Sequence, residues 1–309
     1  MQSPSLTVLM TVHNGMPYLK EAVWSVLNQD LEAFSFLVLN NCSTDGSREF
    51  LEETASRQGE RNPRFHVVHL SSNIGRTAAL DRGLSMVETE LTAILDADDL
   101  AMPGRLSAQC AFFLAHPDID LLGADVMYID GTGNTIGFEH FPANHESLRD
   151  RLPLFNQFAH SACMFRTDAA RRAGGYAQGC RYGQDLALWI AMLASGCKAA
   201  SISGFLAAVR MHPGQTSRSL ARLVMRTEDN HRLATAMLAI PGLARTSRQA
   251  AYFRGAAALL RLGRKKEALS LAWKGLRENP LGTIINPLLH QRLRLEIARR
   301  LRARARRRV

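Results

Sequence analysis

Short apolar segments alternate with helical segments over the first 130 residues of this chain. The apolar segments are nearly continuous, so the strands they predict are buried on both faces. This pattern is typical of an α/β fold, a mostly parallel sheet with helices on each side. The expected strands are Ser5–Val12, Phe34–Leu39, Phe65–Leu70, Leu91–Leu95 and Ile119–Ile129. The expected helices are Pro17–Gln29, Ser47–Arg57, Arg76–Val87 and Pro103–His116, with each proline in a first turn.

The remainder of the chain has a different pattern. Residues 135–215 are more irregular, and from Ser217 onward the sequence is helical. Residues 249–282 fit one helical hairpin with Gly263 at its turn; a single tetratricopeptide repeat is the alternative. The elements expected between residues 135 and 215 are a helix near Ala143–Leu152, a strand near Ser161–Phe165, a helix over Gln184–Ala194 and a strand near Ala200–Met211.

Composition indicates a globular protein of one large or two smaller domains, with 309 residues and 46% apolar content. No apolar run reaches the roughly eighteen residues that a transmembrane helix needs, and the N-terminus lacks the pattern of a signal peptide. The five cysteines are scattered and fit neither a disulfide framework nor a zinc site. We therefore expect a cytoplasmic protein.

The net charge of +10 is concentrated in residues 289–309, which contain nine arginines and one glutamate. Apolar residues recur there at a spacing of four, which predicts a basic amphipathic helix: Leu289, Leu293, Ile297 and Leu301. Such a helix suits the anionic inner face of the cytoplasmic membrane, whereas a solvated tail without a partner is the alternative. Nucleic acid is disfavoured as a partner, because it would also recruit basic residues of the folded domain.

Polar residues gather where each of the first four expected strands ends. Each loop alone fits ordinary turn chemistry, because Asn, Asp, Gly and Ser dominate turns. The carboxyl ends of parallel strands, however, meet at one edge of a sheet, so the four loops together predict a ligand-binding crevice. The loops are Thr11–Gly15, Asn40–Ser47, Ser71–Arg76 and Asp96–Asp99.

The fourth loop, Asp96-Ala97-Asp98-Asp99, places three carboxylates directly after a buried strand. Carboxylates this close repel one another unless a cation neutralises them, and oxygen ligands suit Mg²⁺ or Mn²⁺. Chance alone supplies roughly one Asp-x-Asp in a chain of this length, so the position after a strand carries the prediction. We expect a metal here that bridges to a substrate diphosphate.

Eight segments, in order along residues 5–217, resemble glycosyltransferase family 2, whose members have the GT-A fold. The segments are SLTVLMTVHNG, VLNNCSTDGS, SSNIGRTAALDRGL, AILDADDLAMPGRL, HSACMFR, AGGY, GQDLALW and RMHPGQTS. The resemblance implies inverting transfer of a sugar from a nucleoside diphosphate donor to a hydroxyl of a surface glycan or lipid-linked acceptor. It also implies a GT-A domain followed by a C-terminal helical region. The implied division is 1–217 for this domain (nucleotide-binding half 1–130, acceptor half 131–217), 218–288 for a helical extension and 289–309 for the tail.

The resemblance assigns the first two loops to the nucleoside. The family usually has two aspartates where this chain has two asparagines, which leaves the nucleotide open: UDP is the default, and GDP or dTDP are alternatives. Arg76 would reach the base or the diphosphate, or would be an ordinary surface arginine. The residues that would surround the nucleoside are Thr11, His13, Asn14, Asn40 and Asn41.

The resemblance also makes Asp98 the principal metal ligand, with Asp99 assisting it or binding the donor sugar. Asp96 would lie on the ribose or sugar side, and His212 would lie near the metal or diphosphate. For Asp99, a helix N-cap is the alternative.

Asp185 would be the general base that deprotonates the acceptor hydroxyl, in a single displacement that inverts the anomeric carbon. The family usually has a glutamate where Gln184 stands, so a second acid is absent. A cap of the following helix is the alternative for Asp185. His160 and Ser161 would line the acceptor side.

Two other functions remain open from the sequence. A sugar nucleotidyltransferase shares the sheet and the metal dependence, but Thr11–Gly15 lacks the expected Gly-rich basic loop. A non-catalytic helical scaffold with a degenerate transferase domain would explain the departures from the family pattern. Retention of both Asp98 and Asp185 argues against that scaffold.

Overall fold

A computed structural model describes residues 5–58, 64–176, 179–212 and 223–280 of the chain. The strands are β1 (Leu6–Val12), β2 (Ser35–Asn40), β3 (Phe65–His69), β4 (Leu91–Ile94), β5 (Leu100–Ala101), β6 (Leu121–Asp130), β7 (Thr135–Glu139), β8 (Met164–Arg166) and β9 (Ala199–Met211). The helices are α1 (Leu19–Leu27), α2 (Ser47–Gln58), α3 (Arg76–Met86), α4 (Arg105–Ala115), α5 (His145–Arg151), the 3₁₀ turn η1 (His160–Ala162), α6 (Thr167–Arg172), α7 (Gln184–Ala194), α8 (Leu223–Met237), α9 (Arg245–Arg261) and α10 (Lys265–Glu278).

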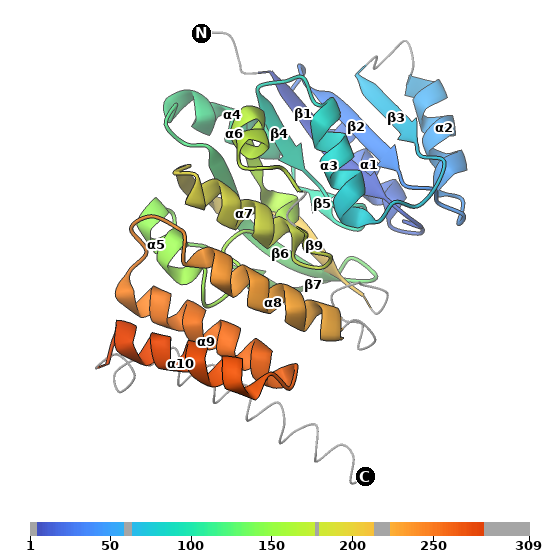
Figure 1. Cartoon of the computed structure of the whole chain (residues 1–309). Coiled ribbons are helices and arrows are strands. Elements are labelled where there is room, and N and C mark those ends of the chain that lie inside the picture. Colours follow the sequence, from blue (N-terminus) through green and yellow to red (C-terminus); the bar gives the residue numbers. More distant parts are fainter. Residues whose placement is uncertain (1–4, 59–63, 177–178, 213–222, 281–309) are drawn as a thin grey trace.

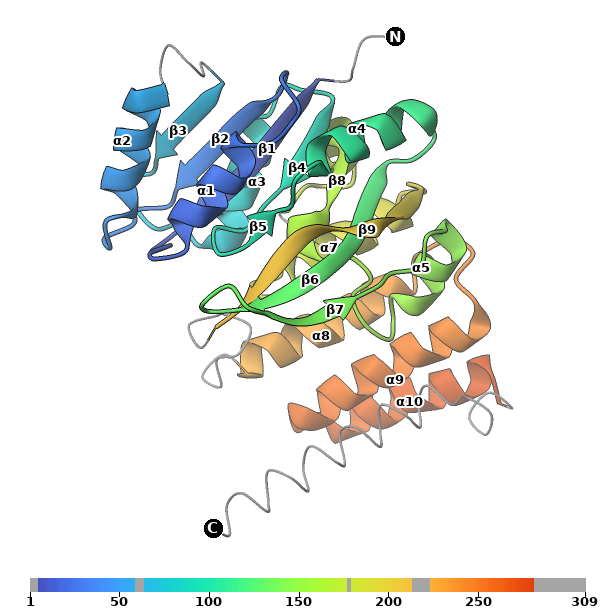
Figure 2. The same cartoon turned by 180° about the vertical axis from the view of Figure 1, so that it is seen from behind.

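The strands form one sheet in the order β3-β2-β1-β4-β8-β6-β9-β5, with β7 beside β6 (Figures 1 and 2). The pairings make β1, β2, β3, β4, β6 and β9 run in one direction, whereas β5, β7 and β8 run against them. The predicted mostly parallel α/β sheet is therefore confirmed. The loops after β1, β2, β3 and β4 leave the sheet at one edge, where a ligand crevice is expected.

Both faces of the sheet are buried, because β1 alternates between two separate cores. Leu9 packs into a core shared with α3 and α7, whereas Val8 and Met10 pack into a core shared with α1 and α4. The helices of these two cores lie on opposite sides of the sheet (Figures 1 and 2). This two-sided burial explains why the sequences of the central strands β1 and β4 are nearly continuously apolar.

Several element boundaries differ from the prediction. The prolines predicted in first turns stand two residues ahead of α1 and α4, which begin at Leu19 and Arg105. The strand predicted near Ser161–Phe165 is wrong at its start, because His160–Ala162 forms η1 and the strand begins at Met164. The side chains of His160 and Ser161 in η1 form hydrogen bonds with Asp96 and Asp99 of the acidic loop. The turn places both side chains toward that loop, whereas successive residues of a strand would point to opposite faces. The short elements β5, β7 and α6 were not predicted.

Helices α8, α9 and α10 stack on the side of the sheet that carries α7 (Figure 1). Gly255 of α9 allows close packing, because a Cβ there would lie 2.7 Å from Leu271 of α10 and 3.6 Å from Ala234 of α8. The predicted hairpin is confirmed, with Gly263 at φ 77° in the α9–α10 turn. The predicted domain boundary at residue 217 and the basic tail over 289–309 lie outside the described residues. Among the residues described, no helix has the length and apolar character that crossing a membrane requires.

Candidate active site

The loops after β1 and β2 interlock at the carboxyl edge of the sheet. The backbone N–H of Asn14 donates to Ser43 Oγ over 3.0 Å, and the Thr44 N–H donates to Asn14 Oδ1 over 2.8 Å. The ring nitrogen Nδ1 of His13 lies 2.9 Å from the backbone oxygen of Asn41. Thr11 stands near the end of β1 and is half-buried, while His13 and Asn14 are exposed. The structure thus brings together the residues of these two loops that were predicted to surround the nucleoside.

Asn40 and Asn41 are buried, with exposed fractions of 1% and 2%, and use their amides inside the protein. Asn40 lies 3.0 Å from a ring nitrogen of His69 and accepts from the backbone of Ser43. Asn41 donates to Asn73 Oδ1 over 3.0 Å and accepts from the Ile74 N–H. These bonds join the loop after β2 to the loop after β3. A contact of Asn40 or Asn41 with a nucleoside stays a prediction.

The bonds of Asn41 explain why an amide stands where the family usually has a carboxylate. Asn73 Oδ1 already accepts from the Gly75 N–H, so it faces Asn41 as an acceptor. An aspartate at position 41 would oppose that oxygen with a second acceptor and without a donor. At position 41, the departure from the family pattern therefore has a local structural cause.

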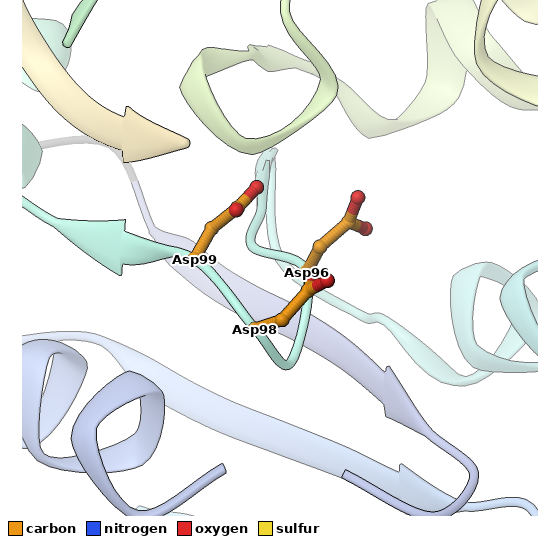
Figure 3. Close-up of side chains that lie close together, drawn as sticks. All are labelled: Asp96, Asp98 and Asp99. Atoms are coloured by element: carbon orange, nitrogen blue, oxygen red, sulfur yellow. The ribbon is translucent and has the colours of Figure 1, made fainter. Parts of the chain in front are cut away.

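The acidic loop holds three carboxylates between β4 and β5, with ligand oxygens within 4.8 Å of one another (Figure 3). Asp96 lies between two basic side chains: Arg76 Nη2 at 2.6 Å and His160 Nδ1 at 2.8 Å. Burial alone would raise the pKa of Asp96, but the charges of Arg76 and His160 outweigh it and lower that pKa. Asp96 is therefore held as an anion.

Asp99 is buried, and its carboxylate points toward the end of β9 (Figure 3). It accepts from the Ser161 hydroxyl and, over 2.8 Å, from the backbone N–H of Arg210. Burial first, and then the neighbouring charges of Asp98 and Asp96, raise the pKa of Asp99 well above its usual range. The N-cap alternative for Asp99 is wrong, because Gly104 stands at the N-cap of α4 and Asp99 ties η1 to β9 instead.

Asp98 is the most open of the three carboxylates, with its side chain 33% exposed. Its Oδ2 lies 3.0 Å from His212 Nε2, and its Oδ1 accepts no hydrogen bond from the residues that the structure describes. Carboxylate oxygens fit Mg²⁺ or Mn²⁺, and a divalent cation here would offset the repulsion among the three carboxylates. The three carboxylates of the acidic loop could hold such an ion, and His212 contacts this cluster through Asp98.

Arg210, near the end of β9, was not singled out from the sequence, although it lies in the RMHPGQTS segment. Its side chain is buried, donates to the backbone oxygen of Asp98 over 3.0 Å, and bonds Glu21 Oε2 at 2.6 Å. Its guanidinium lies 4.7 Å from the ring centroid of Tyr18, which also packs 4.7 Å from the ring of His212. Arg210 thus fixes the acidic loop and β9 against α1.

His160 lies beneath the acidic loop rather than on an open surface. Its Nε2 is 3.0 Å from the hydroxyl of Tyr176, which is fully buried, so a chain of bonds runs from Arg76 through Asp96 and His160 to Tyr176. Burial raises the pKa of the Tyr176 hydroxyl well above its usual range, so that hydroxyl stays protonated. His160 is therefore positioned to orient Asp96.

Asp185 stands in the first turn of α7, and the cap alternative is wrong because Gly183 occupies the N-cap. Its Oδ2 accepts from Asn156 Nδ2 over 3.0 Å. The pKa of Arg76 is raised mainly by the charge of Asp96, and the charges of Asp98 and Asp185 add to this effect. The charges of the predicted base and of the acidic loop therefore act on the same arginine.

Arg105 is a fully buried cation beneath this site. Its Nη2 donates to the backbone oxygens of Ile94 and Cys163, over 2.9 and 3.1 Å, and its Nε donates to Gln109 Oε1. Burial lowers the pKa of Arg105 to about 10. These bonds join β4, just before the acidic loop, to the segment that carries Ser161.

We expect Arg105→Met to lower the free energy of unfolding by about 3 kcal/mol, because it removes three charge-assisted hydrogen bonds to buried acceptors. Urea denaturation measures this as a lower midpoint with an unchanged slope. Arg82→Met, at an exposed position of α3, is the matched control and should stay within about 0.5 kcal/mol. An unaltered midpoint for Arg105→Met would contradict the structural role of these bonds.

Comparison with known proteins identifies the class of enzyme. A glycosyltransferase of Methanocaldococcus jannaschii is 29% identical over 215 residues, which cover 68% of this chain and 72% of its own length. The O-antigen biosynthesis glycosyltransferase WbnJ of Escherichia coli is 27% identical over 217 residues, covering 69% and 82%.

Solved structures show the same fold. TarS of S. aureus, in complex with UDP-GlcNAc, superposes with a TM-score of 0.65 at 17% identity over 88% of this chain and 79% of its own. The mannosyltransferase PcManGT of Pyrobaculum calidifontis, in complex with GDP-Man and Mn²⁺, gives 0.58 at 17% identity over 95% and 81%. Residues 7–174 match the family described as Glycosyl transferase family 2. The chain therefore belongs to glycosyltransferase family 2, with the GT-A fold.

Proposed function

We propose that this chain is a metal-dependent inverting glycosyltransferase that moves a sugar from a nucleoside diphosphate donor to an acceptor hydroxyl. The observation that carries the proposal is the open carboxylate of Asp98, which lies beside His212 and acts, together with Asp185, on the charge of Arg76. Bound there, Mg²⁺ or Mn²⁺ would offset the charge of the departing diphosphate. The Mn²⁺ and GDP-Man in the mannosyltransferase support this assignment.

Asp185 acts as the base in this proposal. The acceptor oxygen bonds to the anomeric carbon while the bond from that carbon to the diphosphate oxygen breaks, and Asp185 takes the hydroxyl proton. Attack from the face opposite the leaving group inverts the anomeric centre. Asn156 orients the carboxylate through Oδ2, and Oδ1 accepts no hydrogen bond from any described residue, so it is available for the proton.

The donor nucleotide would lie over the loops after β1 and β2. Thr11, His13 and Asn14 offer side chains that are exposed or half-buried, while Asn40 and Asn41 support them from beneath. Arg76 would exchange part of its contact with Asp96 for the diphosphate. UDP is the first nucleotide to test, because TarS binds UDP-GlcNAc in the same fold. GDP and dTDP follow.

The acceptor would be a surface polysaccharide or a lipid-linked glycan intermediate. Support comes from the relative named for O-antigen biosynthesis. We place the protein in the cytoplasm, peripherally at the inner face of the cytoplasmic membrane. Membership of family 2 favours this transfer over the nucleotidyltransferase and scaffold alternatives.

A thermal-shift screen of nucleoside diphosphates, with and without Mn²⁺, tests the donor assignment. A diphosphate at about 100 times its Kd should stabilise the protein by about 2.7 kcal/mol, and only when the metal is present. The matching nucleoside monophosphate is the control, because it lacks the bridging phosphate. If no diphosphate raises the Tm in the presence of Mn²⁺, or if the protein consumes nucleoside triphosphates with a sugar phosphate, the proposed function is wrong.

A further inference from the structure

Helix α10 turns two large apolar side chains to solvent. Leu269 is 69% exposed and Trp273 is 62% exposed, the highest values among the large apolar side chains described. The two residues are four apart, so they occupy the same face of the helix one turn from each other. Figures 1 and 2 show α10 as the outermost of the stacked helices, on the side of α9 that is remote from α8.

The opposite face of α10 is the one that packs on α9. Ala268 and Gly275 are buried there, and a Cβ on Gly275 would lie 3.0 Å from Tyr252 Cβ. Because Leu269 and Trp273 are mostly exposed, they bury little apolar surface against α9. Neighbouring exposed apolar residues of this kind mark a contact surface more often than residues scattered singly do.

The exposed face of α10 is also cationic. Lys266, Lys274 and Arg277 are exposed, and none of them pairs with an acidic side chain within the described ranges. The two acidic residues of the helix are neutralised by other partners, since Glu267 bonds Arg264 and Glu278 bonds Arg248. The face therefore combines an apolar centre with a net positive rim.

We propose that this face of α10 docks on an anionic phospholipid surface. The indole of Trp273 and the side chain of Leu269 would enter the headgroup region, where such residues concentrate. The flanking cations would bind the lipid phosphates. A second copy of α10, or the arginine-rich residues 289–309, would bring charge of the same sign to this face, so charge favours the lipid. The inference rests on α10 alone and not on the catalytic proposal.

Tryptophan fluorescence of the full-length protein tests this docking. In a Trp24→Phe background the emission that responds to added lipid comes from Trp273, because Trp189 is fully buried. Vesicles containing phosphatidylglycerol should shift that emission to shorter wavelength, and lipids brominated on their acyl chains should quench it. Vesicles of phosphatidylcholine alone should do neither, because they lack the anionic charge.

Two variants separate the charged and apolar contributions, with vesicle sedimentation as the readout. Lys266→Glu combined with Arg277→Glu should weaken binding at least about tenfold, because two positive charges become negative and the charge near the surface changes by four units. Leu269→Ser should weaken it about tenfold by removing apolar contact. Arg82→Glu on α3 and Leu114→Ser on α4, both at exposed positions, are the controls and should bind normally.

Binding that is unchanged in both α10 variants would overturn the proposal, as would a Trp273 emission indifferent to anionic vesicles. A blue shift that grows with protein concentration in the absence of lipid would place a second copy on this face. Shielding of Trp273 from iodide in the lipid-free monomer would mean that another part of the chain covers the face. Either of these results contradicts lipid docking.

Discussion

Replacing Asp185 by asparagine is expected to lower kcat for sugar transfer by about 10²–10⁴-fold, the range that general-base catalysis contributes. An amide cannot take the proton of the acceptor hydroxyl, so the attacking oxygen would carry it into the transition state. Asparagine keeps the size of the side chain and an oxygen that can accept from Asn156. Donor binding, measured by calorimetry with Mn²⁺, should therefore stay within about twofold of the unaltered enzyme.

Two further variants make this result specific. Asp168→Asn removes a carboxylate whose side chain is 80% exposed on α6, and it should leave both kcat and donor affinity unchanged. Asn156→Ala leaves the carboxylate of Asp185 in place but removes its hydrogen-bond donor. Its loss of kcat should be smaller than that of Asp185→Asn, because the base remains. Equal turnover of Asp185→Asn and the unaltered enzyme would end the assignment of the base.

The sheet could be predicted from the sequence because β1, β2 and β4 are buried on both faces, whereas β3 at the edge is only partly buried. The apolar run that ends at Leu95 marks β4 for this reason, and the polar loop after it then lies at the carboxyl edge. Elements without such a run were missed. β5 has only the residues Leu100–Ala101, and β7 exposes Ile136 and Phe138, each at 56%, so neither shows the pattern of a buried strand.

Within the site, the sequence located the loops but not the partners of their side chains. Asp96 was expected from its place after a strand, yet its bond to His160 joins residues 64 positions apart. Arg210 reaches Glu21 across 189 positions, and no local pattern reveals such a contact. The pairing depends on the register of β9 beside β6, which includes irregularities near Asp125. Bulges of this kind redirect side chains, and hydrophobic periodicity does not reveal them.

Asp98→Asn is expected to abolish the effect of Mn²⁺ on donor binding, with a loss of affinity of at least about 100-fold. Asp98 is the carboxylate of the acidic loop with an oxygen that none of the described residues engages, so its charge is the one directly available to the ion. The amide can still contact His212, which limits any change to the fold. Calorimetry of UDP, or of the nucleotide that the thermal screen selects, measures the loss with and without Mn²⁺.

Asp99→Asn distinguishes a ligand from a structural carboxylate in the same loop. The raised pKa of Asp99 and its bonds to Ser161 and Arg210 indicate that an amide can replace it at small cost to metal binding. If Asp99→Asn lost Mn²⁺-dependent affinity and Asp98→Asn kept it, the roles of the two residues would be reversed. If both kept it, the metal would lie elsewhere. Because Asp185 contacts neither, its variant should retain the full metal effect under every one of these outcomes.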